Sequence, residues 1–138
     1  MNDILEQARG VLRSQPFSVL LGADVVAFSA DLVEIHVPIT ESLTQHHGFV
    51  HGGVVSYAAD NALTFAGGAA LGPAVVTSEY KINYLRPARG EVLISRARIV
   101  YAGRTQAICR CDVLARTHGE DLLCAVAQGT IALLSAPK

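Results

Sequence analysis

The stretch GGVVSYAADNALTFAGGAALGP, residues 52–73, is the one long helical candidate in the middle of this 138-residue chain. A set of its apolar residues recurs at steps of three and four, which places them on one side of a helix. That side carries Val55, Ala58, Ala62, Phe65 and Ala69, and the opposite side carries Gly53, Ser56, Asp60, Thr64 and Gly67. Gly72-Pro73 is a helix-ending pair. The pattern predicts a central helix over residues 53–71 with Asp60 off the apolar stripe.

Four long runs of β-favouring residues follow, at 74–85, 91–101, 105–115 and 122–134, separated by segments with turn chemistry. Two shorter runs precede the helix, at 25–29 and 32–37, and Ala30-Asp31 between them suits a hairpin. One helix followed by a meander of long strands indicates an α+β fold, with an antiparallel sheet over residues 74–134 curled round the helix. The many Ala and Gly residues of the helix allow the sheet to approach closely.

The N-terminal residues have their own helical pattern. Apolar side chains at Ile4, Ala8 and Val11 predict one short amphipathic helix within residues 1–15, ending before Pro16. The segment 16–22 then leads into the first strand-like runs. No internal repeat or linker divides the chain, so residues 1–138 are expected to form a single domain.

The composition bounds the class of protein. It is 51% hydrophobic and 17% charged, which excludes a disordered chain and suggests a buried interface between subunits. The longest uncharged stretch, residues 61–78, is interrupted by Gly67, Gly68 and Gly72-Pro73, so no membrane span is predicted. Asp3 and Glu6 near the N-terminus do not fit a secretory signal. We therefore expect a cytoplasmic protein.

Cysteine and charge patterns narrow the functions further. Cys109, Cys111 and Cys124 lack metal-ligand spacing and are interpreted as small core hydrophobes. The net charge of −1 argues against sequence-independent nucleic-acid binding. The charge is uneven, about −6 over residues 1–80 and +5 over residues 81–138, so the second half could bind a small polyanion. For any single arginine, a solvent-facing position on a strand is the better interpretation.

One motif connects these elements to chemistry. Gly48-Phe49-Val50-His51-Gly52-Gly53, followed after six residues by Asp60, resembles the signature of hotdog-fold thioesterases of the phenylacetate-degradation (PaaI-like) family. The segment Lys81-Ile82-Asn83-Tyr84-Leu85-Arg86-Pro87-Ala88 and the Gly90-Glu91 pair match the same family in order. The resemblance covers most of the chain. It implies a hotdog fold and hydrolysis of acyl-CoA thioesters.

The resemblance implies roles for particular residues, and the chemistry agrees with them. Thioester hydrolysis needs a nucleophile or general base and donors for the developing oxyanion. Gly53, at a helix start with free N–H groups and the positive end of the helix dipole, is the predicted oxyanion donor. Asp60, two turns along the same face, is the predicted nucleophile or general base. The resemblance places the site at a dimer interface, where Asp60 of one subunit faces the glycine loop of the other.

Three further residues are candidates for the site. Gln45 stands where many relatives of the family have Asn, and its longer amide could still contact the thioester carbonyl or orient water. Thr77 matches the family's hydroxyl residue on the strand after the helix. His51 could donate a hydrogen bond near the site or simply hold the loop. The roles of His46 and His47 stay unassigned.

Phosphates of CoA favour the forked guanidinium group of arginine. Arg86 and Arg89 after the first long strand, and Arg104 in the Gly103 hairpin, are the predicted CoA-binding residues. No metal and no bound cofactor is implied. The resemblance implies at least a homodimer, and further a homotetramer formed as a pair of dimers. The sequence leaves open whether the acyl group is aromatic, medium or long.

Two alternative functions stay open. A hydratase or dehydratase of acyl thioesters pairs a loop histidine with a helical acid, as His47 and Asp60 could, although the loop lacks the His-Phe-Pro element of acyl-carrier-protein dehydratases. A non-catalytic acyl-CoA sensor is the other alternative. It is disfavoured because it would not need Asp60, and the chain has no helix-turn-helix pattern.

Overall fold

The central helix, α3, spans Gly52–Leu71 and ends at Gly72, whose φ of 96° lies in the left-handed region that favours glycine. The computed structural model describes residues 3–134. The other elements are α1 (Asp3–Arg13), α2 (Pro16–Leu21), β1 (Asp24–Phe28), β2 (Val33–Pro38), the 3-10 turn η1 (Glu41–Leu43), β3 (Val75–Tyr84), β4 (Val92–Ala102), β5 (Gln106–Thr117) and β6 (Glu120–Leu133).

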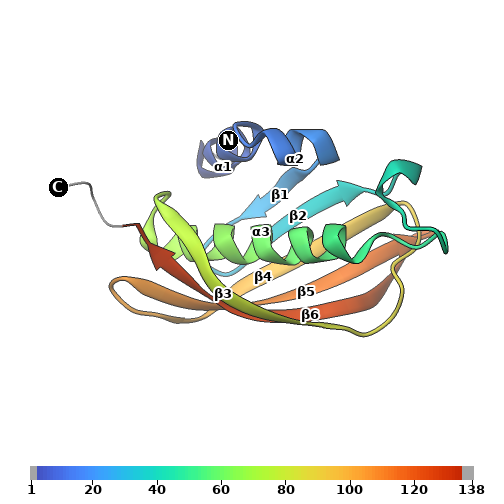
Figure 1. Ribbon diagram of the computed structural model, residues 1–138. Helices are drawn as coiled ribbons and strands as arrows, with labels where there is room; N and C mark the ends of the chain where they lie inside the picture. The colour runs from blue at the N-terminus through green and yellow to red at the C-terminus, as the bar shows by residue number, and fades with distance from the viewer. Residues whose placement is uncertain (1–2, 135–138) are drawn as a thin grey trace.

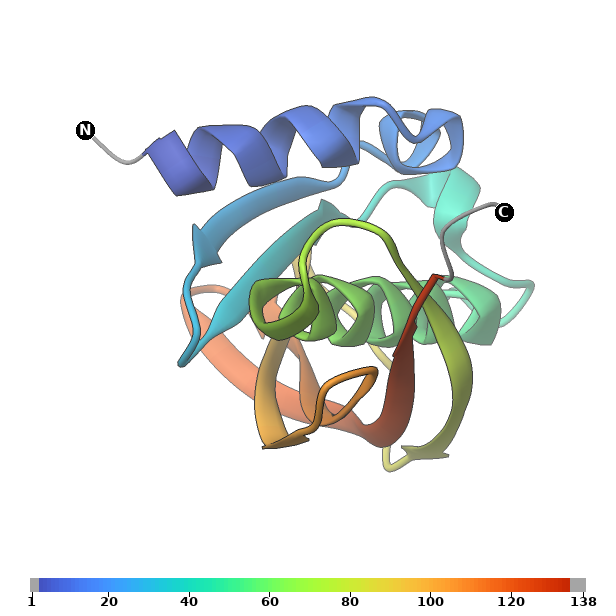
Figure 2. The same ribbon diagram turned by 90° about the vertical axis from the view of Figure 1, so that its left-hand side faces the viewer.

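All six strands form one antiparallel sheet in the order β1-β2-β4-β5-β6-β3. The sheet curves round α3, which lies in its concave face (Figures 1 and 2). This confirms the predicted α+β architecture, with a long helix wrapped by an antiparallel sheet and a short helix at the N-terminus. The four long β-favouring runs correspond to β3, β4, β5 and β6.

The buried side of α3 is wider than its sequence pattern predicts. Val55, Ala58, Ala62 and Phe65 are buried as expected, but Ala59, Leu63 and Ala66 are buried as well. Gly67, assigned to the polar side, is also buried, and Ala69 is only partly so. The sheet contacts α3 through β2, β3, β4, β5 and β6. Because strands on several sides contact the helix, a single narrow stripe underestimates the core.

Two adjacent glycines of α3 offer a direct test of this close approach. A Cβ on Gly67 would lie 2.4 Å from Cγ2 of the fully buried Ile131, whereas one on Gly68 would meet only Val75, at 3.7 Å. We expect Gly67→Ala to destabilise the fold by about 1–3 kcal/mol, because overpacking outweighs the better helix propensity of alanine. Gly68→Ala is the matched control and should be neutral or slightly stabilising. Urea unfolding of both variants measures this difference, and equal stabilities would contradict it.

The N-terminal segment differs from the sequence expectation. Helix α1 ends at Arg13, before Pro16 as predicted, but residues 16–22 do not lead directly into a strand. Pro16 instead starts a second helix, α2, where its missing N–H and fixed φ are tolerated. Helix α2 ends at Gly22, whose φ is 73°.

A buried polar cluster attaches α2 to α3. The Tyr57 hydroxyl donates to Ser18 Oγ at 2.6 Å, and Ser18 in turn donates to Gln15 Oε1 at 2.6 Å. Asn61 Nδ2 donates to the Tyr57 hydroxyl at 3.0 Å. Burial raises the pKa of Tyr57, which keeps its hydroxyl protonated and able to donate. These bonds set the position of the N-terminal helices over α3.

The interpretation of the cysteines is confirmed. Cys109, Cys111 and Cys124 are buried and free, and burial raises the pKa of the Cys109 thiol to about 11. Such thiols stay protonated and unreactive. Within residues 3–134, no helix has both the length and the apolar character needed to cross a membrane.

Candidate functional site

The Asp60 carboxylate lies on the side of α3 that faces β3. The Thr77 hydroxyl, on β3, donates to Asp60 Oδ1 at 2.6 Å. Thr64, one turn after Asp60, has its hydroxyl 2.8 Å from the backbone oxygen of Asp60 and 2.7 Å from the Thr77 hydroxyl. The structure therefore brings the predicted residues Asp60 and Thr77 into direct contact.

The bonding pattern orients the carboxylate. Each threonine hydroxyl carries one proton, so when Thr77 donates to Asp60 Oδ1, the single Thr64 proton is shared between the Asp60 backbone oxygen and the Thr77 hydroxyl. Of the two carboxylate oxygens of Asp60, only Oδ1 accepts a hydrogen bond from a side chain of residues 3–134. Oδ2 is therefore available to a ligand or water. Asp60 is only partly buried. Thr64 was not among the predicted site residues, although its position one turn from Asp60 on the polar side was a usable signal.

His51 is the N-cap residue of α3. Its ring Nδ1 accepts a hydrogen bond from the Gly53 N–H at 2.8 Å, and its backbone oxygen accepts from the N–H groups of Val54 and Val55. A neutral ring accepting at Nδ1 carries its proton on Nε2. The Gly53 N–H, the predicted oxyanion donor, is therefore occupied by the neighbouring histidine in this structure.

Gln45 lies in the loop before the helix and helps to close a tight turn. Its side-chain oxygen accepts from the His47 N–H, and its backbone N–H donates to Phe49 O at 2.8 Å. The rings of His46 and His47 stack with centroids 4.1 Å apart, and His47 lies 6.0 Å from the Phe49 ring. His47 thus belongs to an exposed stack in the loop, and no described hydrogen bond joins it to Asp60.

The three predicted CoA-binding arginines fall into two places. Arg86 and Arg89 lie in the connection after β3, close to the start of α3, and the Arg89 guanidinium lies 4.4 Å from the centroid of the Phe49 ring. A groove of about 370 Å³ runs beside them, lined by Phe49, Val50, Gly52, Val55, Tyr84 and residues 85–88. Arg104 lies in the β4–β5 hairpin at the other end of α3, where Thr105 accepts a backbone bond from Leu133. All three arginines are exposed.

Helix geometry separates the two central residues of the site. Gly53 and Asp60 are seven residues apart, which at 1.5 Å per residue is about 10 Å along the helix axis. A hydrogen-bond donor and an attacking carboxylate must both lie about 3 Å from one carbonyl group. Asp60 therefore cannot directly attack a carbonyl group bound at the Gly53 N–H of the same chain.

The described residues offer no metal site. No three His, Cys, Asp or Glu side chains within residues 3–134 are grouped so as to hold a metal ion. The polar groups that converge are the Thr64 and Thr77 hydroxyls and the Asp60 carboxylate.

Comparison with known proteins identifies the family. The sequence profile of the thioesterase superfamily matches residues 47–122, more than half of the chain. The chain belongs to the thioesterase superfamily. The matched segment contains His51, Gly53, Asp60 and Thr77, whereas Gln45 lies just before it.

Individual relatives agree with membership of the thioesterase superfamily. The crystal structure of a thioesterase family protein from Silicibacter pomeroyi is 33% identical, with a TM-score of 0.89, and the match covers 95% of this chain and 98% of that one. A predicted esterase of Haemophilus influenzae is 32% identical over 117 residues, 83% of each chain. The structure of Escherichia coli PaaI, from the phenylacetic acid degradation operon, has a TM-score of 0.83, 20% identity and coverage of 94% and 92%. At that identity it supports the hotdog fold alone.

Proposed function

We propose that this protein hydrolyses acyl-CoA thioesters to the free acid and CoA, with Asp60 as nucleophile or general base. The observation that carries the proposal is the hydrogen-bonded cluster of Asp60, Thr77 and Thr64, in which one carboxylate oxygen is held and the other is available. Membership of the thioesterase superfamily supports the reaction type.

The proposed reaction breaks the bond between the carbonyl carbon and sulfur and forms a bond from that carbon to oxygen. In one route Asp60 takes a proton from water, whose oxygen attacks the carbonyl. In the other, Asp60 attacks directly and water hydrolyses the resulting anhydride. In both routes one water is consumed and the CoA thiol gains a proton. The water oxygen enters the acid in the general-base route, whereas in direct attack it enters the acid or Asp60, depending on which carbonyl of the anhydride the water attacks. Label found in Asp60 after a single turnover in ¹⁸O-labelled water therefore identifies direct attack.

The proposal assigns the oxyanion to the Gly53 N–H of a second subunit, because about 10 Å separates Gly53 from Asp60 within one helix. An incoming thioester oxygen competes with the His51 ring for this N–H, so the ring must turn away or share the donor. The free N–H groups and the dipole at the helix start favour the developing negative charge. In this proposal His51 is a positioning residue.

Strand β3 is the edge through which we expect two subunits to pair. It lies at the end of the sheet order, has ten residues and exposes Val76 and Tyr84, and the exposed Leu85 follows directly after it. The other edge strand, β1, has five residues and contacts α1. If β3 pairs antiparallel with β3 of a second copy, about a two-fold axis, the start of one strand near Thr77 lies beside the end of the other strand near Tyr84. The Tyr84 hydroxyl donates to Gly52 O at 3.2 Å, so Asp60 would then lie near the partner's helix start.

For CoA we propose the groove beside Arg86 and Arg89, whose guanidinium groups suit phosphate oxygens. Arg89 is partly ordered by the Phe49 ring. Arg104 lies at the far end of α3 and could meet the CoA bound by a second subunit. A pair of such dimers would give the tetramer.

The proposal is tested by following thiol release from a panel of acyl-CoAs. We expect the wild-type protein to release CoA from at least one chain length at well above the background rate. No release from any member would contradict the proposal. Loss of the enoyl-CoA absorbance without thiol release would point to a hydratase instead.

Thr77 provides a finer test of the cluster. Thr77→Val removes the hydroxyl at nearly constant shape, and we expect kcat to fall about 10- to 100-fold, because a hydrogen bond to a charged group contributes about 1.5–3 kcal/mol. Thr77→Ser keeps the donor and is the matched control. Equal kcat values for the valine variant and the wild type would show that this hydroxyl does not position Asp60.

A further inference from the structure

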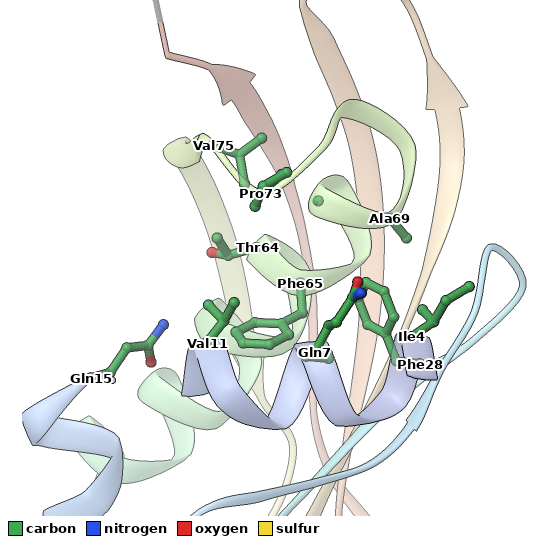
Figure 3. A pocket seen from close by; sticks show the side chains of 12 residues that line it. Ile4, Gln7, Val11, Gln15, Phe28, Thr64, Phe65, Ala69, Pro73 and Val75 are labelled. Carbon is green, nitrogen blue, oxygen red and sulfur yellow. The ribbon is translucent and has the colours of Figure 1, made fainter. Parts of the chain in front are cut away.

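A cavity of about 300 Å³ lies between α1 and α3. Its walls come from α1, β1, α3 and the start of β3 (Figure 3). Helix α1 contributes Ile4, Gln7, Ala8 and Val11, with Gln15 beyond its end; α3 contributes Thr64, Phe65, Gly68 and Ala69; and Phe28, Pro73 and Val75 complete the lining. The lining is mainly aliphatic and aromatic, with polar groups only at the two glutamines and Thr64.

The cavity is elongated. Its lining follows α1 from Ile4 to Val11, seven residues that span about 10 Å at the rise of an α-helix, and continues to Gln15 beyond the end of that helix. Gln15 and Thr64 lie towards one end, and Ile4 and Phe28 lie at the other (Figure 3). The rings of Phe28 and Phe65 meet edge to face, 6.3 Å apart. An apolar cavity that is lined along this length suits an extended chain better than a compact ring.

Thr64 joins this cavity to the Asp60 cluster. Its side chain lines the cavity and also contacts the Thr77 hydroxyl, which is bonded to Asp60 Oδ1. A carbonyl group held beside Asp60 therefore lies next to the Thr64 end of the cavity.

We infer that this cavity binds the acyl chain of the substrate, and that the chain is a straight one of up to about ten carbons. The inference rests on the proposed thioester hydrolysis. One water occupies about 30 Å³ of liquid, and a methylene unit is of comparable size, so the cavity holds about ten such units at most. Apolar walls with few polar groups are typical of sites for small apolar ligands.

The inference is tested by filling the cavity from α3. Gly68→Leu adds a side chain at a position where a Cβ makes only an ordinary contact with Val75, and the rest of the leucine points into the cavity. We expect the ratio of kcat/KM for octanoyl-CoA to that for acetyl-CoA to fall about 10- to 100-fold, because each displaced methylene contributes about tenfold or more. An unchanged ratio would overturn the inference.

Two variants guard against a general effect of the substitution. Val11→Phe fills the same cavity from α1 and should lower the same ratio. Gly10→Leu adds the same side chain as Gly68→Leu, but on α1, one residue before Val11. Gly10 does not line the cavity, and a Cβ there would have no atom within 4 Å, so this variant should leave the ratio unchanged. An equal fall in Gly10→Leu, or a wild-type preference for phenylacetyl-CoA over octanoyl-CoA, would contradict the assignment.

A binding measurement separates this inference from the proposed function. Octanoate should shift the methyl NMR signals of Val11, Ala69 and Val75 in the wild-type protein, whereas acetate should not. If no acyl-CoA is hydrolysed but octanoate shifts these signals, the proposed reaction fails and the cavity assignment stands. If hydrolysis occurs while octanoate leaves these signals unchanged, the cavity assignment fails alone.

Discussion

Replacing Asp60 by Asn lowers kcat for thioester hydrolysis by about 10²- to 10⁴-fold, the range contributed by a positioned general base. The asparagine oxygen can still accept from the Thr77 hydroxyl, so the fold and the position of the side chain are expected to persist. What is lost is the negative charge that attacks the carbonyl or takes a proton from water. Steady-state kinetics with the best acyl-CoA of the panel, together with the melting temperature, measures the effect.

The matched control is Asp31→Asn, which makes the same change in the exposed turn between β1 and β2. It should retain wild-type kinetics. Thiol release that survives Asp60→Asn undiminished would remove Asp60 from the mechanism. A large fall in melting temperature would instead indicate a structural role.

Ser78→Pro is expected to separate the subunits and to abolish most of the activity. Ser78 lies at a bulge in β3, between Thr77 and Glu79, and has no paired residue on β6. Proline at such a bulge spares the ladder within the chain, while an edge strand that carries proline resists pairing with another strand. If the oxyanion donor comes from the partner, losing it costs about 10²- to 10³-fold in kcat.

Analytical ultracentrifugation and thiol release measure the two effects together, with Ser78→Ala as the control that keeps the N–H. A monomeric Ser78→Pro protein with full activity would contradict a site shared between subunits. A protein that stays oligomeric with wild-type activity would show that β3 is not the pairing edge.

The elements of the fold were predictable because they depend on local spacing. The three- and four-residue steps through α3, the Gly72-Pro73 ending and the change to β-favouring runs are properties of neighbouring residues. The extent of the core round Gly67 was not predictable, because it depends on how far the distant strand that carries Ile131 curls round the helix. Helix α2 was missed because Pro16 can end one helix or begin another.

The candidate site divides in the same way. Its residue types came from the Gly52-Gly53 motif and its spacing to Asp60, so their chemistry was visible in the sequence. Three features required the tertiary structure: the bond from Thr77 to Asp60, the His51 ring on the Gly53 N–H, and the cavity between α1 and α3. Hydrogen bonds and cavities depend on distances of a few ångströms between separate elements. Only the packing of β3 and α1 against α3 determines those distances.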